Sequence, residues 1–302
     1  MALVDWMRLI VLASLWGCSY LFIEIALESA SPTTIVLSRI LIAAACLVGY
    51  CAATGQRVRL TGSLVVSFFV MGIVNNVVPF NLIAWGQTHI TGGVASIFNA
   101  TTPLFTVMVA HLWPGGERAT PARVAGVVVG LAGVMVLIGF GAFSRIGDEL
   151  PGQIAMLLAA FSYAISALWG RRLVRVPPMV AAAGMLSASS LMMLPVSFIL
   201  HAPFDPVPTV GGFAAIAALS VLSSAIAYIV FFRLIGTIGS NVMLVTFIMP
   251  VIALTTGALI LGEQIEPRHL AGLGLIFVGL ALVDGRALTL FGRRARRTRH
   301  GP

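Results

Sequence analysis

Hydrophobic residues in this chain come in long runs, which short clusters of glycine, proline and arginine separate. A helix needs about 20 apolar residues to cross the ~30 Å hydrocarbon core of a bilayer. Ten runs reach about that length, and the connections between them are short, so no sizeable soluble domain is expected. The fold class predicted is an all-α polytopic membrane protein with ten spans, over residues 6–28, 32–54, 64–88, 93–113, 122–142, 152–173, 179–200, 210–235, 241–261 and 270–291.

Composition supports the membrane class. Of 302 residues, 59% are hydrophobic and only 9% are charged, whereas soluble domains carry roughly 25% charged residues. So few charges cannot cover a surface in water, which excludes a soluble enzyme, a disordered chain and a secreted disulfide scaffold. We therefore expect a multi-pass protein of the cell (inner) membrane.

The cationic residues predict the orientation of the spans. All 18 are arginines, and fifteen of them fall in connections or ends on one side of the predicted membrane. The other side has Arg145 and Arg268, and Arg39 lies inside a span. Arginine gathers on the cytoplasmic side of membrane proteins and contacts anionic lipids there. Both termini are expected in the cytoplasm, and the net charge of +8 indicates lipid contact, not nucleic-acid binding.

An internal repeat divides the chain. Pro103 and Pro250 occupy the same place in spans four and nine, and 250 − 103 = 147. The offset of 147 pairs Gly92 with Gly239, and after one deletion an offset of 146 applies. It then pairs Glu117, Pro121, Gly126 and Gly133 with Glu263, Pro267, Gly272 and Gly279. The division predicted is a first five-helix repeat over 1–147, a second over 148–291 and a basic cytoplasmic tail over 292–302.

Five spans is an odd number, so the second repeat is expected to enter the membrane from the opposite side. Inverted repeats related by an in-plane axis are typical of secondary transporters, in which one central site opens to either face in turn. The repeat therefore favours transport by alternating access.

Three segments resemble the EamA-type drug/metabolite transporter superfamily: WGCSYLFIEIAL from Trp16, the matching PLFTVMVAHLWPGGERATPARVAGVVVGLAGVMVLIG from Pro103, and PVIALTTGALILGEQIEPRHLAGLGLIFVGLALV from Pro250. Arg39 in span two adds to the resemblance, which is nearest to the YddG-type amino-acid exporters. It implies ten helices with cytoplasmic termini and export or exchange of small polar metabolites. Family members commonly carry Lys where this chain has Glu24, so no role is carried over to that position.

Span four supplies the first candidates for a substrate cavity. Asn99, Thr102, Pro103 and Thr106 lie at i, i+3, i+4 and i+7, which is one face of a regular helix. Polar groups facing hydrocarbon are costly unless they are satisfied, so this face should point inward. The repeat brings Thr246 and Pro250 to the matching face of span nine. Hydrogen bonding between helices is the structural alternative.

Aromatic and amide side chains supply further candidates. Asn81 and Trp85 share a face of span three, Ser224 and Tyr228 hold the matching face of span eight, and Trp16 and Tyr163 correspond in spans one and six. They suit a solute of amino-acid size, and lipid contact or core packing is the alternative. Asn75 and Asn76 are spread with Asn81 over too wide an arc for one face. At least one of them must bond to a neighbouring helix instead.

Glu24 and Arg39 lie on either side of the first connection between spans, at similar predicted depth. A lone charge at that depth is costly, so an ion pair is expected, either as a structural bridge or as a gate. The glycines of spans five and ten, such as Gly126 and Gly279, suit close helix packing.

The function predicted is secondary transport of amino acids or similar small metabolites, out of the cell, through a central cavity between the repeats. A sugar-nucleotide or phosphate-ester antiporter of the same fold is the alternative, although it needs more basic residues in the cavity than Arg39. An intramembrane enzyme is an alternative of another class, but no catalytic pair is found at mid-membrane depth. No cofactor and no metal are expected, because the sequence holds no CxxC, HExxH or GxSxG motif.

Overall fold

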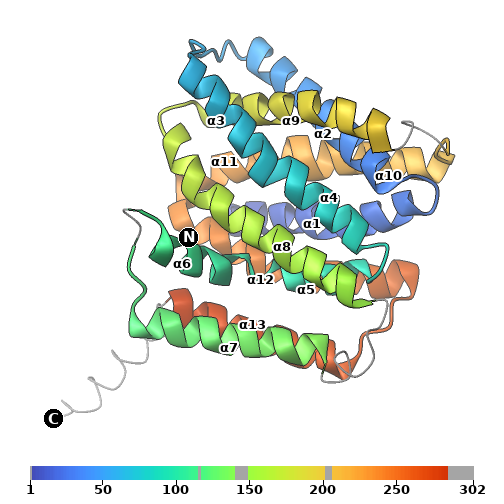
Figure 1. The fold of residues 1–302 in the computed structure, drawn as a ribbon, viewed down its shortest axis with the longest axis vertical. Coiled ribbons are helices and arrows are strands. Elements are labelled where there is room, and N and C mark those ends of the chain that lie inside the picture. The colour runs from blue at the N-terminus through green and yellow to red at the C-terminus, as the bar shows by residue number, and fades with distance from the viewer. Residues whose placement is uncertain (1, 115–116, 140–148, 201–205, 285–302) are drawn as a thin grey trace.

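The computed structural model describes residues 2–114, 117–139, 149–200 and 206–284, and this part of the chain is helical without strands (Figure 1). Ten helices in it are long and apolar enough to span a membrane, which confirms the predicted number. They cover Leu3–Leu27, Pro32–Ala53, Gly62–Gly86, Gly92–Leu112, Pro121–Ile138, Glu149–Leu173, Pro178–Leu200, Val210–Ile238, Asn241–Leu261 and Pro267–Asp284. The predicted tail, residues 292–302, lies outside the described residues.

Five spans are divided into shorter elements. In chain order the elements are α1 (Leu3–Leu27), α2 (Pro32–Ala53), α3 (Gly62–Gly72), η1 (Ile73–Val77), α4 (Val78–Gly86), α5 (Gly92–Asn99), α6 (Thr102–Leu112), α7 (Pro121–Ile138), α8 (Glu149–Trp169), η3 (Gly170–Leu173), α9 (Pro178–Leu200), α10 (Val210–Ser220), η4 (Val221–Ile226), α11 (Ala227–Ile238), η5 (Gly239–Leu244), α12 (Val245–Thr256), η6 (Gly257–Leu261) and α13 (Pro267–Asp284).

Several spans begin at a hydroxyl residue that caps the helix. The side-chain oxygens of Ser31, Thr61, Thr120 and Thr209 each accept a hydrogen bond from a backbone N–H two or three positions into the following helix. The first amides of a helix have no partner within it, so a capping oxygen satisfies a group that would otherwise be exposed to lipid headgroups or apolar surroundings. These caps fix where the chain turns back into the membrane.

Spans three and eight each contain a π-helical turn at mid-length, η1 and η4. The two turns begin at Ile73 and Val221, and 221 − 73 = 148, which is within one residue of the repeat offset. A π-turn holds one more residue than an α-turn and is frequent at functional sites. It therefore changes the direction of the side chains beyond it relative to those before it.

Span four is broken at its centre. α5 ends at Asn99 and α6 begins at Thr102, with Pro103 in the first turn of α6. Proline has no N–H to give to the preceding turn, and the Thr102 hydroxyl donates to the Asn99 carbonyl oxygen at 2.7 Å instead. The predicted continuous face from Asn99 to Thr106 is therefore wrong, because two separate helices carry it.

The last helix of each repeat forms a close pair. α7 and α13 lie side by side along the lower edge of the view in Figure 1. A Cβ added to Gly126 would lie 2.6 Å from the Gly279 carbonyl oxygen, and one on Gly133 would lie 2.8 Å from that of Gly272. In the repeat, Gly126 corresponds to Gly272 and Gly133 corresponds to Gly279. Gly126 therefore meets the counterpart of Gly133, and Gly133 meets the counterpart of Gly126. That exchange is what a two-fold axis between the repeats produces.

Candidate functional site

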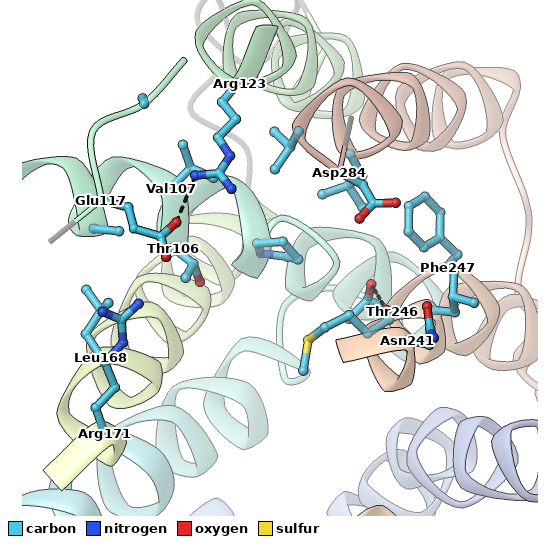
Figure 2. Close-up of a pocket in the computed structure, with 17 residues that line it drawn as sticks. Thr106, Val107, Glu117, Arg123, Leu168, Arg171, Asn241, Thr246, Phe247 and Asp284 are labelled. Atoms are coloured by element: carbon cyan, nitrogen blue, oxygen red, sulfur yellow. Dashed lines mark hydrogen bonds and ion pairs between the residues drawn. The ribbon is translucent and has the colours of Figure 1, made fainter. Parts of the chain in front are cut away.

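A pocket of about 290 Å³ opens between the two repeats at one end of the bundle (Figure 2). We name this end the arginine-rich side, after Arg57, Arg118 and Arg172 in its connections. The opposite end, with the connections 28–31 and 262–266, is the arginine-poor side. Spans four and nine face each other across the pocket, and its lining includes three of the predicted cavity residues, Pro103, Thr106 and Thr246.

The mouth of the pocket is charged. Glu117 and Arg123 form an ion pair at 3.0 Å, visible as a dashed line in Figure 2, and Arg171 and Asp284 also line the opening. The Glu117 side chain is 63% exposed, so the ion pair lies in contact with water. Such exposed pairs contribute at most about 1 kcal/mol, and this one does not close the pocket.

The arginine-poor side is closed by two carboxylates on one helix end. The Gly92 N–H donates to Glu24 Oε2 at 2.8 Å, and the Gly93 N–H donates to Glu263 Oε2 at 3.1 Å. Both amides belong to the first turn of α5, where the helix dipole favours negative charge. Spans one, four and nine are thereby joined at this end. We name Glu24, Glu263 and these two amides the carboxylate latch.

The latch depends on glycine at both amide positions. A Cβ on Gly92 would lie 2.9 Å from Glu24 Oε2, and one on Gly93 would lie 2.6 Å from Glu263 Oε2. Both distances are shorter than an ordinary van der Waals contact between carbon and oxygen. The pair of glycines is therefore what allows two carboxylates to reach adjacent amides.

Between the latch and the pocket lies a buried polar cluster around Arg39. The Arg39 residue is 7% exposed, and its Nε donates to Ser224 Oγ at 2.9 Å. Its guanidinium carbon lies 3.9 Å from the centre of the Phe80 ring, a cation–π contact. The phenol groups of Tyr20, Tyr163 and Tyr228 are near enough to interact with its charge. Arg39 comes from the first repeat, whereas Ser224, Tyr163 and Tyr228 come from the second.

The π-turn of span three places two asparagines in this cluster. Asn75 Nδ2 donates to the Tyr228 hydroxyl at 3.1 Å, and Asn75 Oδ1 accepts from Ser166 at 2.9 Å. Asn76 Nδ2 donates to Ser189 Oγ at 3.0 Å. Neighbouring residues of a regular helix point about 100° apart. Here Asn75 and Asn76 both reach partners in the second repeat. The network therefore joins the two repeats through polar contacts at mid-membrane depth.

Asn99 ends α5 beside the same cluster. Its side chain lies next to the Tyr20 phenol, and its Oδ1 is buried without a hydrogen-bond partner among the described residues. Buried amide oxygens are usually bonded. Span four therefore contacts three regions in order: the latch at 92–93, the polar cluster at Asn99 and the pocket from Pro103 onward.

The structure brings most of the predicted site residues together. Pro103, Thr106 and Thr246 line the pocket, while Tyr163, Ser224, Tyr228 and Asn99 surround Arg39 or adjoin its neighbours. Thr102 bridges the break in span four. Pro250 is buried within α12, and Trp16 packs on Phe231 at 5.3 Å between ring centres.

Two predicted positions in span three lie elsewhere. Trp85 is 43% exposed and packs against His89 with the two rings tilted and their centres 4.4 Å apart. Asn81 donates to the Val77 carbonyl oxygen of its own helix and approaches the Met193 sulfur. The exposure of Trp85 agrees with the alternative of lipid contact, and Asn81 is bonded within its own helix instead of facing a cavity.

The predicted ion pair between Glu24 and Arg39 is absent from the described residues. Glu24 accepts from Gly92 and Arg39 donates to Ser224, and none of the three ion pairs found there includes either residue. Similar depth along two helices does not place two side chains on facing surfaces. Glu24 instead accepts a hydrogen bond from the backbone amide of Gly92.

Several residues of the site were not predicted. Nothing in the sequence distinguishes Tyr20 and Phe80 from ordinary core aromatics. The prediction that at least one asparagine of span three bonds to a neighbouring helix is confirmed, because Asn75 and Asn76 both bond to side chains of the second repeat. Glu263 was recognised only as a repeat position. The Gly92–Gly93 pair directly before an apolar run was the available signal, because paired glycines at a helix start permit close approach of a ligand or carboxylate.

Ten helices of spanning length, a buried polar cluster between the two repeats and a pocket at one end are the features of a membrane transporter. Comparison with known proteins agrees: the EamA-like transporter family matches residues 6–139 and again residues 150–284. The chain belongs to this family, whose activity is transport and not catalysis.

Relatives are also named as transporters, and two of them match about nine tenths of this chain. The inner membrane transporter YedA of Escherichia coli (strain K12) is 26% identical over 280 residues, covering 91% of this chain and 89% of that protein. A protein of Streptantibioticus cattleyicolor named "Probable terminal-alkyne amino-acid exporter" is 25% identical over 291 residues, 92% of each chain. The aromatic amino acid exporter YddG of Ancylobacter novellus is 32% identical over 147 residues, covering 44% of this chain and 50% of that protein. A crystal structure with a TM-score of 0.66 and 21% identity covers 93% of this chain and 97% of its own, and shares the fold.

Proposed function

We propose that the protein is a secondary transporter of the inner membrane that exports amino acids or similar small metabolites by alternating access between its two inverted repeats. The arginine-rich side is the cytoplasmic side, so the described conformation opens inward. The observation that carries the proposal is the difference between the two ends of the bundle. One end is held by the carboxylate latch, and the equivalent end has an open pocket.

The repeat supplies the other half of the cycle. Glu263 corresponds to Glu117, and the Gly92–Gly93 amides correspond to those of residues 239 and 240. Glu263 binds its amide here, whereas Glu117 pairs with Arg123 at the pocket mouth. In the outward-open state Glu117 leaves Arg123 and binds the amides at the start of η5, while Glu263 releases Gly93. The two states then exchange one equivalent carboxylate–amide contact, whereas the Glu24–Gly92 contact has no counterpart because Glu24 corresponds to Arg171.

The pair of last helices provides the fixed part of this motion. α7 and α13 meet through glycines on a local two-fold axis, so the contact can persist while the other spans rock on either side. Small residues at such contacts permit close backbone approach in membranes. The pocket and the polar cluster lie where the moving parts of both repeats meet.

The size and polarity of the site support a small polar solute. Hydroxyl, amide and aromatic side chains dominate the cluster, and Arg39 is its one cation within the described chain. A sugar nucleotide or phosphate ester carries two or more negative charges and would want several cations. Names of two relatives that transport amino acids point the same way.

Counterflow in proteoliposomes tests the proposal. Vesicles loaded with an unlabelled L-amino acid and diluted into the same labelled amino acid should accumulate label transiently, at equal pH and zero membrane potential. Glucose 6-phosphate loaded in the same way should give no counterflow. Protein-free vesicles are the control, and a panel of amino acids that yields no counterflow would refute amino-acid transport. Reporter fusions at Gly55 and Gln264 should read cytoplasmic and external, respectively.

A further inference from the structure

The guanidinium of Arg39 lacks the partner that a buried cation requires. It lies in span two with 7% of the residue exposed, and Ser224 satisfies only its Nε. Its two terminal nitrogens have no hydrogen-bond partner, and no carboxylate lies within ion-pair distance of it, among residues 2–114, 117–139, 149–200 and 206–284. An unpaired charge inside a bilayer protein is costly and marks a functional position.

The surroundings of Arg39 prepare it for a planar anion. Phe80 covers one face of the guanidinium at 3.9 Å, and Ser224 fixes Nε at 2.9 Å, so the fork cannot rotate freely. The terminal nitrogens of a guanidinium fit the two oxygens of a carboxylate in a bidentate pair. The neighbouring phenols can donate hydrogen bonds but carry no charge that would neutralise it.

A second polar group without a hydrogen-bond partner in the described part of the chain lies beside Tyr20. Asn99 Oδ1 is a buried acceptor without a partner in the described chain, and Tyr20 adjoins both Asn99 and Arg39. An acceptor of this kind suits an ammonium group. A buried cation and a buried acceptor on either side of Tyr20 match the two charged groups of a zwitterion.

The repeat makes the site asymmetric, as such a ligand requires. At the offset of 147, Arg39 corresponds to Leu186 and Tyr20 to Ala167. The second repeat therefore offers no equivalent cation, and only one orientation of a ligand across the axis satisfies both charges.

We propose that Arg39 binds the carboxylate of the transported solute and Asn99 accepts from its ammonium group, so that the substrates are α-amino acids with both groups free. This inference rests on the proposed transport function and narrows its substrate class. The Phe80 ring and the phenols of Tyr163 and Tyr228 surround the position that the carboxylate would take.

Ligand-induced thermal stabilisation of the purified full chain in detergent tests this site without requiring transport. The probes are L-phenylalanine, its methyl ester, phenethylamine, which lacks the carboxylate, and 3-phenylpropionate, which lacks the ammonium; L-leucine and isoamylamine form a second matched pair. In the unaltered protein both amino acids should bind at least 100-fold more tightly than the ester and the amines. 3-Phenylpropionate should fall between the amino acid and the amine.

Variants separate the two contacts. Arg39→Gln should bind L-phenylalanine no better than phenethylamine, and Arg39→Lys should fall between the two because it keeps the charge without the fork. Asn99→Ala should lose the preference for L-phenylalanine over 3-phenylpropionate but keep the preference over the ester. Ser224→Ala, which removes the Nε partner alone, should still prefer carboxylates and controls for general damage to the cluster.

Equal binding of the amino acid, ester and amine by the unaltered protein would overturn the inference and leave transport itself intact. A failure of either amino acid to stabilise the protein would overturn it as well. The counterflow assay decides the transport function independently, because it reads flux of any amino acid in the panel and not the chemical group that is recognised.

Discussion

Gly126 and Gly279 face each other so closely that a Cβ on either one would lie 2.6 Å from the other's carbonyl oxygen. No side chain fits between α7 and α13 at this level. The contact is stabilised by van der Waals packing of backbone on backbone, which lipid cannot replace with equal density. The same kind of contact occurs between Gly133 and Gly272, as the correspondence of positions between the two repeats predicts.

A methyl group at this contact should destabilise the protein. Gly279→Ala is expected to cost about 1–3 kcal/mol, the usual cost of overpacking, despite the better helix propensity of alanine. Gly274→Ala on the same helix, where a Cβ meets nothing within 4 Å, should be neutral or stabilising by up to about 1 kcal/mol. Thermal unfolding in detergent measures both. Equal melting temperatures for the two variants would show that α7 and α13 do not meet at this glycine.

Weakening the carboxylate latch should open the arginine-poor side. Glu263→Gln replaces a charge-assisted bond to Gly93 with a neutral one, a loss of roughly 1 kcal/mol or more, which is several-fold in the population of the open state. Ser96 is fully buried one turn inside the latch. In a background with Cys18, Cys46 and Cys51 replaced by serine, a cysteine at Ser96 should react several-fold faster with an impermeant maleimide.

Glu266→Gln is the matched control in the same connection. A hydrogen bond from Arg268 holds the pKa of the Glu266 carboxyl below its usual range, so this residue is ionised at neutral pH. It takes no part in the latch, and its variant should leave the maleimide rate unchanged. A similar acceleration in both variants would mean that loss of any carboxylate in this connection, and not the latch, controls access.

Glu24 and Arg39 should act independently in a double-mutant cycle. Because each bonds to a different partner, the changes in unfolding free energy from Glu24→Gln and Arg39→Gln should add within about 0.5 kcal/mol. Arg39→Gln with Ser224→Ala, a pair in contact at 2.9 Å, should instead show coupling. A coupling above about 1 kcal/mol between the Glu24 and Arg39 substitutions would show that the two residues do form an ion pair.

The two amides of span three should differ sharply in importance. Asn75→Ala removes the bonds that join span three to the Tyr228 hydroxyl and to Ser166, at an expected cost of about 1–3 kcal/mol, and should also slow counterflow. Asn81→Ala removes a bond to its own helix and should cost well under that. Paired measurements of melting temperature and counterflow rate decide the matter. A larger effect at Asn81 would contradict the assignment of Asn75 to the contact between the repeats.

Filling the pocket should block entry from the arginine-rich side. Thr106 lines the pocket, so Thr106→Trp should reduce counterflow more than tenfold while the protein still purifies as a folded species. Met108, two residues further along α6, is 38% exposed on the outer surface. Met108→Trp should therefore keep most of the activity, and equal inhibition by both would place the pathway elsewhere.

The spans and the repeat could be predicted because they depend on patterns that persist over many residues. A run of about 20 apolar residues rarely forms anything other than a membrane-spanning helix. The order of proline, glutamate and glycine after Pro103 and Pro250 is long enough to identify the repeat. The close packing predicted for Gly126 and Gly279 was confirmed for the same reason.

The side-chain partners could not be predicted with equal success. A π-turn is one extra residue in an apolar helix, and nothing in the letters around Asn75 and Asn76 distinguishes it from an α-turn. The reach of Arg39 to Ser224 depends on the rotation of two helices about their axes, which is set by packing of the whole bundle. Depth alone, the quantity that sequence supplies, wrongly selected Glu24.

The π-turns have a consequence for every comparison of this chain with its relatives. Each one shifts the angular register of its span, so a residue after position 77 faces differently from what an uninterrupted alignment of span three suggests. A relative that has lost or gained the extra residue will align well in letters and still present a different side chain to the solute. Specificity can thus change by insertion of one residue in a helix, without substitution at any position that touches the ligand.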